Sequence, residues 1–306
     1  MTDMKNFGNK DDPRKRPKSA AFGIGGAGRN IISSFDSDKY TNIDIYEVGE
    51  KNRLKKYPTI NLLKKDVEEI LTSDISRKYR ENTHSERILE NKIQDYDVLY
   101  LLCGLGGEMG SCVSKTCSVI GKELSVFTVA LFATPFKTES PSRIEFSKKT
   151  KCELDDLADI SVAFSNHKLL KMNPQLSLKK AFEVMNNIIS IPMEDLNGVM
   201  TREDIPKLRN FCEGVEGFSI GAGYGRGREK GIRALNEALR SPWLEDNGFE
   251  RIIAIITRGE DSTKYDVQDV LESLDNKYPD SKIMYGVREN KSIKKRIRVT
   301  ILASKD

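Results

Sequence analysis

Two glycine clusters, each directly after a short apolar run, are the features that most constrain the fold of this 306-residue chain. GIGGAG begins at Gly23, and GLGGEMG begins at Gly104 after the apolar run Val98–Cys103. Glycines at the end of a strand let several backbone N–H groups surround an anion, because no side chain blocks the approach. The pattern indicates an α/β protein with a phosphate site at strand ends. Glu108 interrupts the second cluster with a charge that repels phosphate.

Strand-like and helix-like segments alternate along the first two thirds of the chain. Strands are expected at 19–22, 42–48, 97–102, 125–132 and 159–164, and a long helix at 176–196. Such alternation favours a mostly parallel sheet that is covered by helices on both faces. The first part of the chain is therefore predicted to be a doubly covered α/β domain.

Beyond Asp204 the pattern predicts a second, smaller α/β domain, with a helix opened by the glycine-rich residues 221–231. The alternating residues Ile297–Ile301 predict a half-exposed strand whose cations face solvent. The resulting division is a disordered basic tail over 1–18, a nucleotide-binding domain over 19–175, a connecting helix and loop over 176–205, and a C-terminal α/β domain over 206–306.

Composition excludes several classes of protein. The net charge of +4 is too small to indicate a nucleic-acid partner. No apolar run approaches the roughly 20 residues of a membrane span, so we expect a cytoplasmic protein without direct membrane insertion. Five cysteines without a CxxC motif indicate neither a disulfide framework nor a zinc site, and two distant histidines argue against a His-based metal site or catalytic triad. No resident metal is predicted.

The first glycine cluster alone leaves three interpretations open. It satisfies GxGxxG, which fits a dinucleotide fold with Asp44 or Glu47 as the ribose-binding acid. It fits another nucleotide or a structural turn as well. The second cluster, about 80 residues later, favours a di- or triphosphate, which needs contacts from two sides and is not expected in a dinucleotide fold. The helices that follow each cluster would direct their N-termini at the phosphates.

Several motifs resemble FtsZ and, more distantly, tubulin. In chain order they read GIGGAGRN, GLGGEMGSC, TPFKTESPSR, SNHKLL, AFEVMNN, ALRSPWLE, RIIAIITRGED and KIMYGV followed by RIRVTIL. The resemblance covers nearly the whole chain after the tail, and archaeal FtsZ-like proteins are the expected nearest relatives. It implies an FtsZ/tubulin-like GTPase domain with a parallel sheet, joined by a long central helix to a smaller C-terminal α/β domain.

The resemblance also implies a guanine-nucleotide site that takes GTP or GDP, with or without Mg²⁺. Asn166 and Asn186 each offer a donor and an acceptor to the edge of guanine, unless they are ordinary surface residues. Glu139 and Arg143 correspond to ribose and base contacts. The nucleotide-binding set is Gly25, Gly26, Ala27, Gly28, Asn30, Glu50, Gly104, Gly106, Gly107, Glu108, Met109, Gly110, Ser111, Pro135, Glu139, Arg143, Asn166 and Asn186.

The phosphate loops depart from the FtsZ pattern in two ways. The family's third glycine loop falls in the glycine-free interval between Gly49 and Gly104, so sensing of the terminal phosphate is expected to be lost. Three cations there, Arg77, Lys78 and Arg80, could contact phosphate by charge instead. The second loop replaces family glycines and a threonine by Glu108, Met109 and Cys112. Glu108 is tolerable if it turns outward, holds Mg²⁺ or is neutralised by Arg29.

The hydrolysis loop is also altered. FtsZ inserts an NxDxxD loop into the site of the next subunit, but the matching stretch NGVMTREDIPKL has Val199 and Thr201 at two of those positions. Asp204 remains as the residual catalytic carboxylate and would act on a neighbouring subunit. Because a water-positioning carboxylate contributes about 10²–10⁴ in rate, weak or absent hydrolysis is expected. Glu203 together with Asp204 would be needed for full GTPase activity.

The sequence therefore predicts a self-assembling, FtsZ-like cytoskeletal protein that binds guanine nucleotide and turns it over slowly. Its expected partner is a second copy of itself in a homo-oligomer or filament, or a true FtsZ. Three alternatives stay open: a non-polymerising dimeric scaffold or regulator of FtsZ-type filaments, an active GTPase, and an NAD-dependent enzyme.

Overall fold

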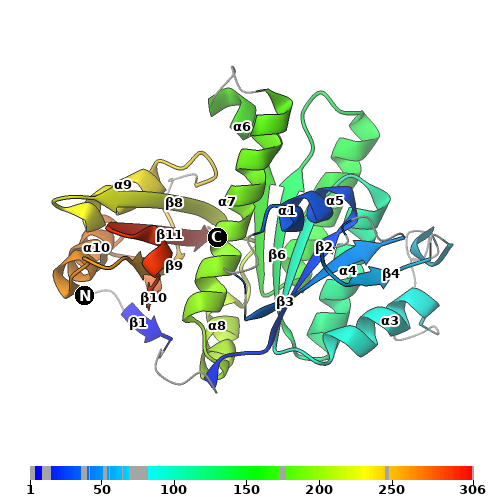
Figure 1. Cartoon of the computed structure of the whole chain (residues 1–306), viewed down its shortest axis with the longest axis horizontal. Helices are drawn as coiled ribbons and strands as arrows, with labels where there is room; N and C mark the ends of the chain where they lie inside the picture. The colour runs from blue at the N-terminus through cyan, green and yellow to red at the C-terminus, as the bar shows by residue number, and fades with distance from the viewer. Residues whose placement is uncertain are drawn as a thin grey trace. The chain divides into compact units, whose positions relative to one another are not determined.

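A computed structural model of the chain describes residues 4–8, 15–35, 40, 42–50, 54, 56–63, 65–68, 82–172, 177–244 and 248–304 (Figure 1). The chain divides into two compact units, residues 17–190 and residues 1–16 together with 191–306. Across the described residues, no helix is both long and apolar enough to cross a bilayer.

The unit of residues 17–190 is built on six parallel strands in the order β4-β3-β2-β5-β6-β7. The strands are β2 (Ser19–Ile24), β3 (Ile43–Gly49), β4 (Thr59–Asn61), β5 (Val98–Gly104), β6 (Phe127–Thr134) and β7 (Ile160–Ser165). The helices are α1 (Gly25–Ser33), α3 (His84–Ile93), α4 (Glu108–Glu123), α5 (Pro141–Leu157), α6 (Asn166–Met172) and the first half of α7 (Leu178–Val199). Strand order reverses between β2 and β5, which is where open α/β sheets bind ligands.

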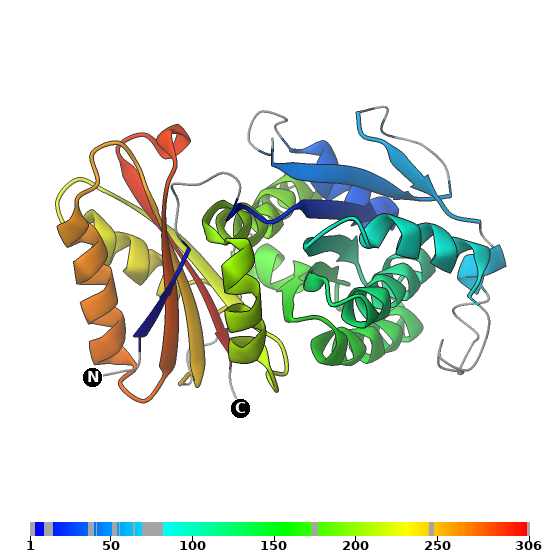
Figure 2. The same cartoon turned by 90° about the horizontal axis from the view of Figure 1, so that it is seen from below.

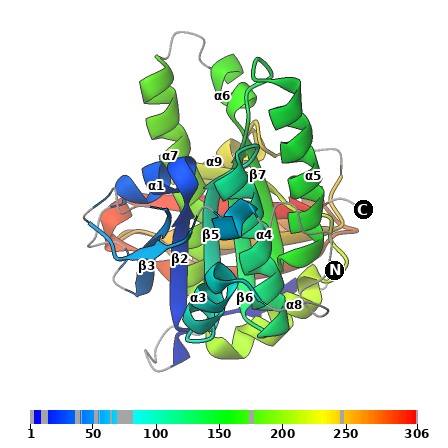
Figure 3. The same cartoon turned by 90° about the vertical axis from the view of Figure 1, so that its right-hand side faces the viewer.

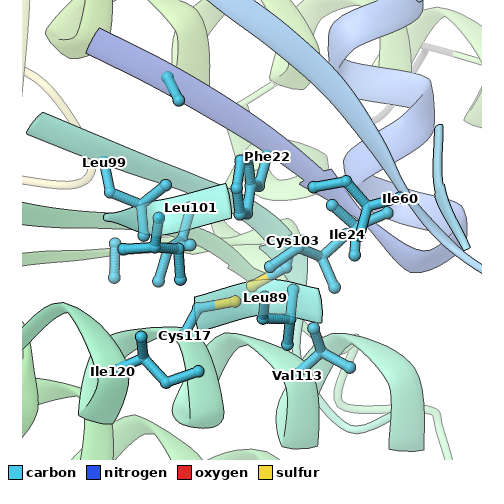
Figure 4. Close-up of a cluster of buried hydrophobic side chains, with 14 of the residues drawn as sticks. Phe22, Ile24, Ile60, Leu89, Leu99, Leu101, Cys103, Val113, Cys117 and Ile120 are labelled. Carbon is cyan, nitrogen blue, oxygen red and sulfur yellow. The ribbon is translucent and has the colours of Figure 1, made fainter. Parts of the chain in front are cut away.

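The core of this unit lies between the sheet and the helices α3 and α4 (Figure 3). Figure 4 shows Phe22, Leu101 and Cys103 of the strands facing Val113 and Cys117 of α4. All described residues of β2 are buried, as is typical of a parallel strand covered on both faces. Continuous apolar runs such as that of β5 were predictable for this reason.

The second unit contains a five-stranded sheet in the order β1-β10-β9-β11-β8, in which only β11 is antiparallel to its neighbours. Its strands are β1 (Met4–Phe7), β8 (Ser219–Arg226), β9 (Arg251–Arg258), β10 (Lys282–Glu289) and β11 (Arg296–Ser304). Its helices are the end of α7, η4 (Arg202–Asp204), α8 (Ile205–Cys212), α9 (Lys230–Leu239), α10 (Lys264–Lys277) and η5 (Lys291–Ile293). The boundary between the units falls inside α7, which continues through Pro192.

The predicted disordered tail over residues 1–18 is wrong for residues 4–7. They form the edge strand β1 beside β10 (Figure 2), and Phe7 is buried. Phe7 packs directly over Gly286: a Cβ atom added at this glycine would lie only 3.1 Å from the Phe7 ring. An apolar residue with a matching glycine in a distant strand is a long-range feature, so local composition does not predict it. Residues 9–14 of the predicted tail lie outside the described residues.

The glycine-rich segment that was expected to open a helix belongs mostly to strand β8. A Cβ atom at Gly221, Gly223 or Gly225 would lie between 1.8 and 2.3 Å from a backbone oxygen of α9, and these oxygens are spread from its first to its last turn. Real Cβ atoms do not approach this closely, so the glycines are needed for α9 to lie directly on the strand. They serve packing in this unit, and no phosphate site is indicated there.

Arg298 of β11 is buried, which corrects the prediction of a solvated cationic face. It donates to Asp195, a fully buried carboxylate that also accepts hydrogen bonds from Thr257 Oγ1 at 2.9 Å and Thr300 Oγ1 at 2.6 Å. Arg288 Nη1 lies 3.3 Å from the same carboxylate. Burial alone would lower the pKa of the Arg298 guanidinium, but the nearby charges of Asp195 and Glu194, with the hydrogen bond to Asp195, together outweigh it and raise the pKa. The arginine therefore stays charged inside the sheet.

We expect Asp195→Ala to lower the free energy of unfolding of this unit by about 3–5 kcal/mol, because it removes the fully buried carboxylate of Arg298 and leaves that buried cation with only the partly exposed Glu194. Urea unfolding followed by tryptophan fluorescence measures this, since the single tryptophan, Trp243, is buried in the same unit. The matched control Asp269→Ala, on the exposed face of α10, should change the value by no more than about 0.5 kcal/mol. Equal effects of the two substitutions would contradict this account.

Candidate nucleotide site

The two glycine turns converge at the end of neighbouring strands. The first leads from β2 into α1 and the second from β5 into α4, at the point where strand order reverses. A Cβ atom added at Gly104 would lie 2.7 Å from the Cβ of Ala27 in the first turn. One added at Gly25 would lie 3.3 Å from Met109 Cγ in the second. The two turns therefore form one continuous surface, as the sequence predicted.

Both helices present uncapped N-termini to this surface. The residues before them, Ile24 and Gly107, make no side-chain capping hydrogen bond. The first N–H groups of a helix have no partner within the helix, and the helix dipole adds partial positive charge at the same end. Gly26 is open to the site, because a Cβ added there would meet no atom within 4 Å. The arrangement can bind a diphosphate between two helix ends.

A cavity of about 630 Å³ lies over these turns, within the range of small-molecule sites. Its wall comes from both turns, the end of β6, α5, α6 and α7, all in the unit of residues 17–190. The predicted nucleotide contacts in that wall are Gly25, Gly26, Ala27, Asn30, Gly104, Gly107, Glu108, Met109, Gly110, Pro135, Glu139, Arg143, Asn166 and Asn186.

Four predicted contacts are not part of the cavity wall. Gly28 lies against the sheet, where a Cβ would come within 2.1 Å of Leu102 O. Gly106 has a φ of +91° and its N–H donates to Ser111 Oγ at 3.0 Å, so this pair shapes the turn. Glu50, after the end of β3, is exposed and outside the wall. These glycines and the serine hold the backbone in place for their neighbours.

One end of the cavity carries amide groups. Asn166 is more than nine-tenths buried, yet its side chain makes no hydrogen bond with any described residue. Asn186 Nδ2 donates to the backbone oxygen of Asn30 at 3.2 Å, which leaves its Oδ1 as an acceptor. An amide that lines a cavity without a protein partner is available to hydrogen-bond a ligand. The two asparagines can therefore recognise the donor and acceptor edge of a base.

Phe182 belongs to the same end, and the sequence analysis missed it. It lines the cavity, is 44% exposed, and packs edge-to-face against Phe136 with ring centroids 5.9 Å apart. From the sequence it counted among the periodic apolar positions of α7 that face the core. The exposure of its ring to the cavity indicates that Phe182 can stack on a ligand. Helical periodicity in the sequence does not reveal which apolar residues are exposed in this way.

Most charged groups near the turns form ion pairs with one another. Arg143 Nη1 lies 3.1 Å from Glu139 Oε2, while Glu139 Oε1 accepts the N–H of Phe136. Arg29 does not neutralise Glu108, contrary to one of our expectations, because its Nε lies 2.8 Å from the buried carboxylate of Glu47. Of the other cations considered, residues 77, 78 and 80 lie outside the described residues.

The two acids proposed for a dinucleotide ribose are engaged elsewhere. Glu47 is fully buried with Arg29, and Asp44 accepts a hydrogen bond from Tyr96 at 2.8 Å. Neither carboxylate belongs to the cavity wall. A dinucleotide fold needs such an acid free beside the ribose, so this geometry disfavours an NAD site.

Asp204 lies in the other unit and is turned inward. Its Oδ2 accepts hydrogen bonds from the N–H of Gly8 at 3.0 Å and from the N–H and Oγ1 of Thr201 at 2.9 and 2.6 Å. The residue is 3% exposed and completes a capping box at the start of η4. In this conformation Asp204 has a structural role, and its carboxylate is not presented as a catalytic group.

Among the described residues, the turns carry neither a metal-binding cluster nor a nucleophilic thiol. Among the residues that the structure describes, no group of three or more His, Cys, Asp or Glu side chains could hold a metal ion. Burial, with a smaller contribution from the charge of Glu108, raises the pKa of the Cys112 thiol to about 11. That thiol is therefore protonated at neutral pH, and the candidate site depends on backbone groups, amides and three charged side chains.

Comparison with known proteins shows which proteins this chain resembles. No protein-family model matches the chain. The cell division protein FtsZ of Aquifex aeolicus is 26% identical over 304 residues, covering 94% of this chain and 82% of that protein. FtsZ of Methanothermobacter thermautotrophicus is 25% identical, with coverage of 94% and 79%.

Solved structures agree in fold. The empty FtsZ dimer of M. jannaschii has a TM-score of 0.82 at 21% identity, covering 96% of this chain and 89% of that chain. The GDP-bound CetZ1 monomer of Haloferax volcanii has a TM-score of 0.74 at 16% identity, covering 94% and 93%. The fold is therefore the one that these FtsZ and CetZ structures share. In sequence the chain is similar to FtsZ, as its motifs predicted.

Substituting a glycine that is packed against backbone should affect stability more than substituting one that is open to the cavity. We expect Gly110→Ala to destabilise the protein by about 1–3 kcal/mol, since its Cβ would lie 2.1 Å from Gly104 O. Gly26→Ala should fold with nearly unchanged stability, because its Cβ meets nothing within 4 Å. Thermal unfolding followed by circular dichroism compares them. Similar destabilisation by both substitutions would show that Gly26 does not face an open site.

Proposed function

We propose that this chain is a self-assembling protein that binds guanine nucleotide and hydrolyses GTP slowly or not at all. The observation that carries the proposal is one cavity lined both by two uncapped helix N-termini and by the mostly buried Asn166, whose side chain has no partner among the described residues. A phosphate-binding end and a base-binding end in one cavity are the requirements for a nucleoside phosphate.

The wall residues fit each part of a guanosine phosphate. The first turns of α1 and α4 would hold the phosphates, and Glu139 with Arg143 would lie beside the ribose. Asn166 and Asn186 would pair with guanine, and Phe182 would stack on it. Among proteins of this fold, the CetZ1 monomer of Haloferax volcanii was solved with GDP, which supports the choice of nucleotide.

Self-assembly is supported by relatives in the same fold. An FtsZ of M. jannaschii was solved as a dimer, and CetZ2 of Haloferax volcanii as a protofilament bound to GTPγS. Slow hydrolysis is supported by the chain itself. Val199 and Thr201 replace two polar residues of the family loop, and the carboxylate of Asp204 is held by Gly8 and Thr201. A water-positioning carboxylate that is absent or turned away removes about 10²–10⁴ in rate.

Nucleotide binding is tested by the content of the purified protein and by calorimetry. We expect GDP or GTP to be released on acid denaturation, and Asn166→Ala to weaken GDP binding about 10- to 100-fold, as for a lost buried hydrogen-bond pair of 1–3 kcal/mol. Asn91→Ala, on the exposed face of α3, is the matched control and should bind like the unmodified chain. Absence of guanine nucleotide binding to the unmodified chain would refute the proposal.

Assembly and turnover are tested together by sedimentation and electron microscopy with GTP and with GDP, and by phosphate release over a range of protein concentrations. We expect filaments or concentration-dependent oligomers with phosphate release far slower than one per minute, because the carboxylate of Asp204 is held by Gly8 and Thr201. A single dimer mass by light scattering at every concentration and nucleotide would instead support the scaffold alternative. Brisk phosphate release would show that Asp204 and Glu203 suffice for catalysis.

A further inference from the structure

Glu108 is an unbalanced negative charge at the phosphate end of the cavity. It is the first residue of α4, it is exposed, and it lines the cavity beside Gly107 and Gly110. Its carboxylate makes no hydrogen bond or ion pair with any described residue. A carboxylate at this place competes with an incoming phosphate for the same helix N-terminus.

The cations around Glu108 do not compensate it. Arg143, the one described cation in the cavity wall, is paired with Glu139. Arg29 is paired with the buried Glu47. Lys115, two turns further along α4, lies 2.8 Å from Glu153. The described wall therefore carries a net charge of −1, from one Arg and two Glu side chains.

Charge of this sign acts differently on nucleotides with different numbers of phosphates. The amide end of the cavity fixes the base, so each further phosphoryl group adds negative charge at the end where Glu108 stands. Like charges repel more strongly the closer they lie and the less water separates them. Backbone N–H groups contribute only partial charges in return. The unfavourable contribution therefore grows from a diphosphate to a triphosphate.

We propose that Glu108 makes the site selective for guanosine diphosphate over guanosine triphosphate. The inference rests on the proposed guanine-nucleotide binding and assigns to Glu108 the choice between its two forms. The carboxylate places a fixed negative charge where a terminal phosphate would need a positive one.

Calorimetric titration of nucleotide-free protein with GDP and with GTP, in EDTA and in Mg²⁺, tests this. In EDTA the unmodified chain should bind GDP at least about tenfold more tightly than GTP. Glu108→Gln should raise GTP affinity at least about tenfold and GDP affinity by a smaller factor, so that the preference disappears. Glu108→Asp keeps the charge and should keep the preference. Glu123→Gln, at the far end of α4, is the matched control and should change neither affinity.

Three outcomes separate the possibilities. Equal affinity of the unmodified chain for GDP and GTP, or an equal gain for both in Glu108→Gln, would overturn the selectivity. A loss of GTP affinity in Glu108→Gln that appears only with Mg²⁺ would overturn it as well and would identify Glu108 as a metal ligand. Binding of neither nucleotide to the unmodified chain would refute the proposed function itself.

Discussion

The close approach of two helix N-termini to two neighbouring strands is the constraint on which the rest of the site depends. Gly28 allows α1 to touch the backbone of β5, and Gly110 allows α4 to touch the backbone at Gly104. Any side chain at either position would push its helix away from the sheet. Because β2 and β5 are adjacent and parallel, both helices begin at the same edge and direct their free N–H groups at one point.

Few side-chain cations are free where the two glycine turns meet, because most cations near the turns already form ion pairs within the protein. Arg29 supports the end of β3 through Glu47, where its Nη2 takes the space that a side chain at Gly49 would need. A phosphate site made mainly of backbone groups depends on geometry more than on net charge. One added carboxylate, Glu108, therefore has a larger effect here than it would in a site rich in lysine and arginine.

Features encoded by neighbouring residues could be predicted from the sequence, and features encoded across the sheet could not. Five strands of the first unit, the two glycine turns and the amides at 166 and 186 follow from local patterns and family motifs, whereas the short edge strand β4 was not predicted. The strand β1, the buried Arg298 and the packing glycines of β8 depend on partners far along the chain: Gly286, Asp195 and α9. Phe182 shows the same limit, because the periodicity that placed it on α7 does not tell which side of the helix borders a cavity.

The turn after α7 shows how a distant segment can change the role of a residue. If Asp204 were to activate water for a neighbouring subunit, its Oδ2 would first have to release the N–H groups of Gly8 and Thr201. Gly8 follows β1, which is fixed on β10 through Phe7, and its φ of +85° and contact with Val199 leave no space for a side chain. Releasing these N–H groups without new partners costs free energy. The N-terminal strand thus stabilises the inward conformation of Asp204, and this supports the proposed slow turnover alongside the missing loop residues.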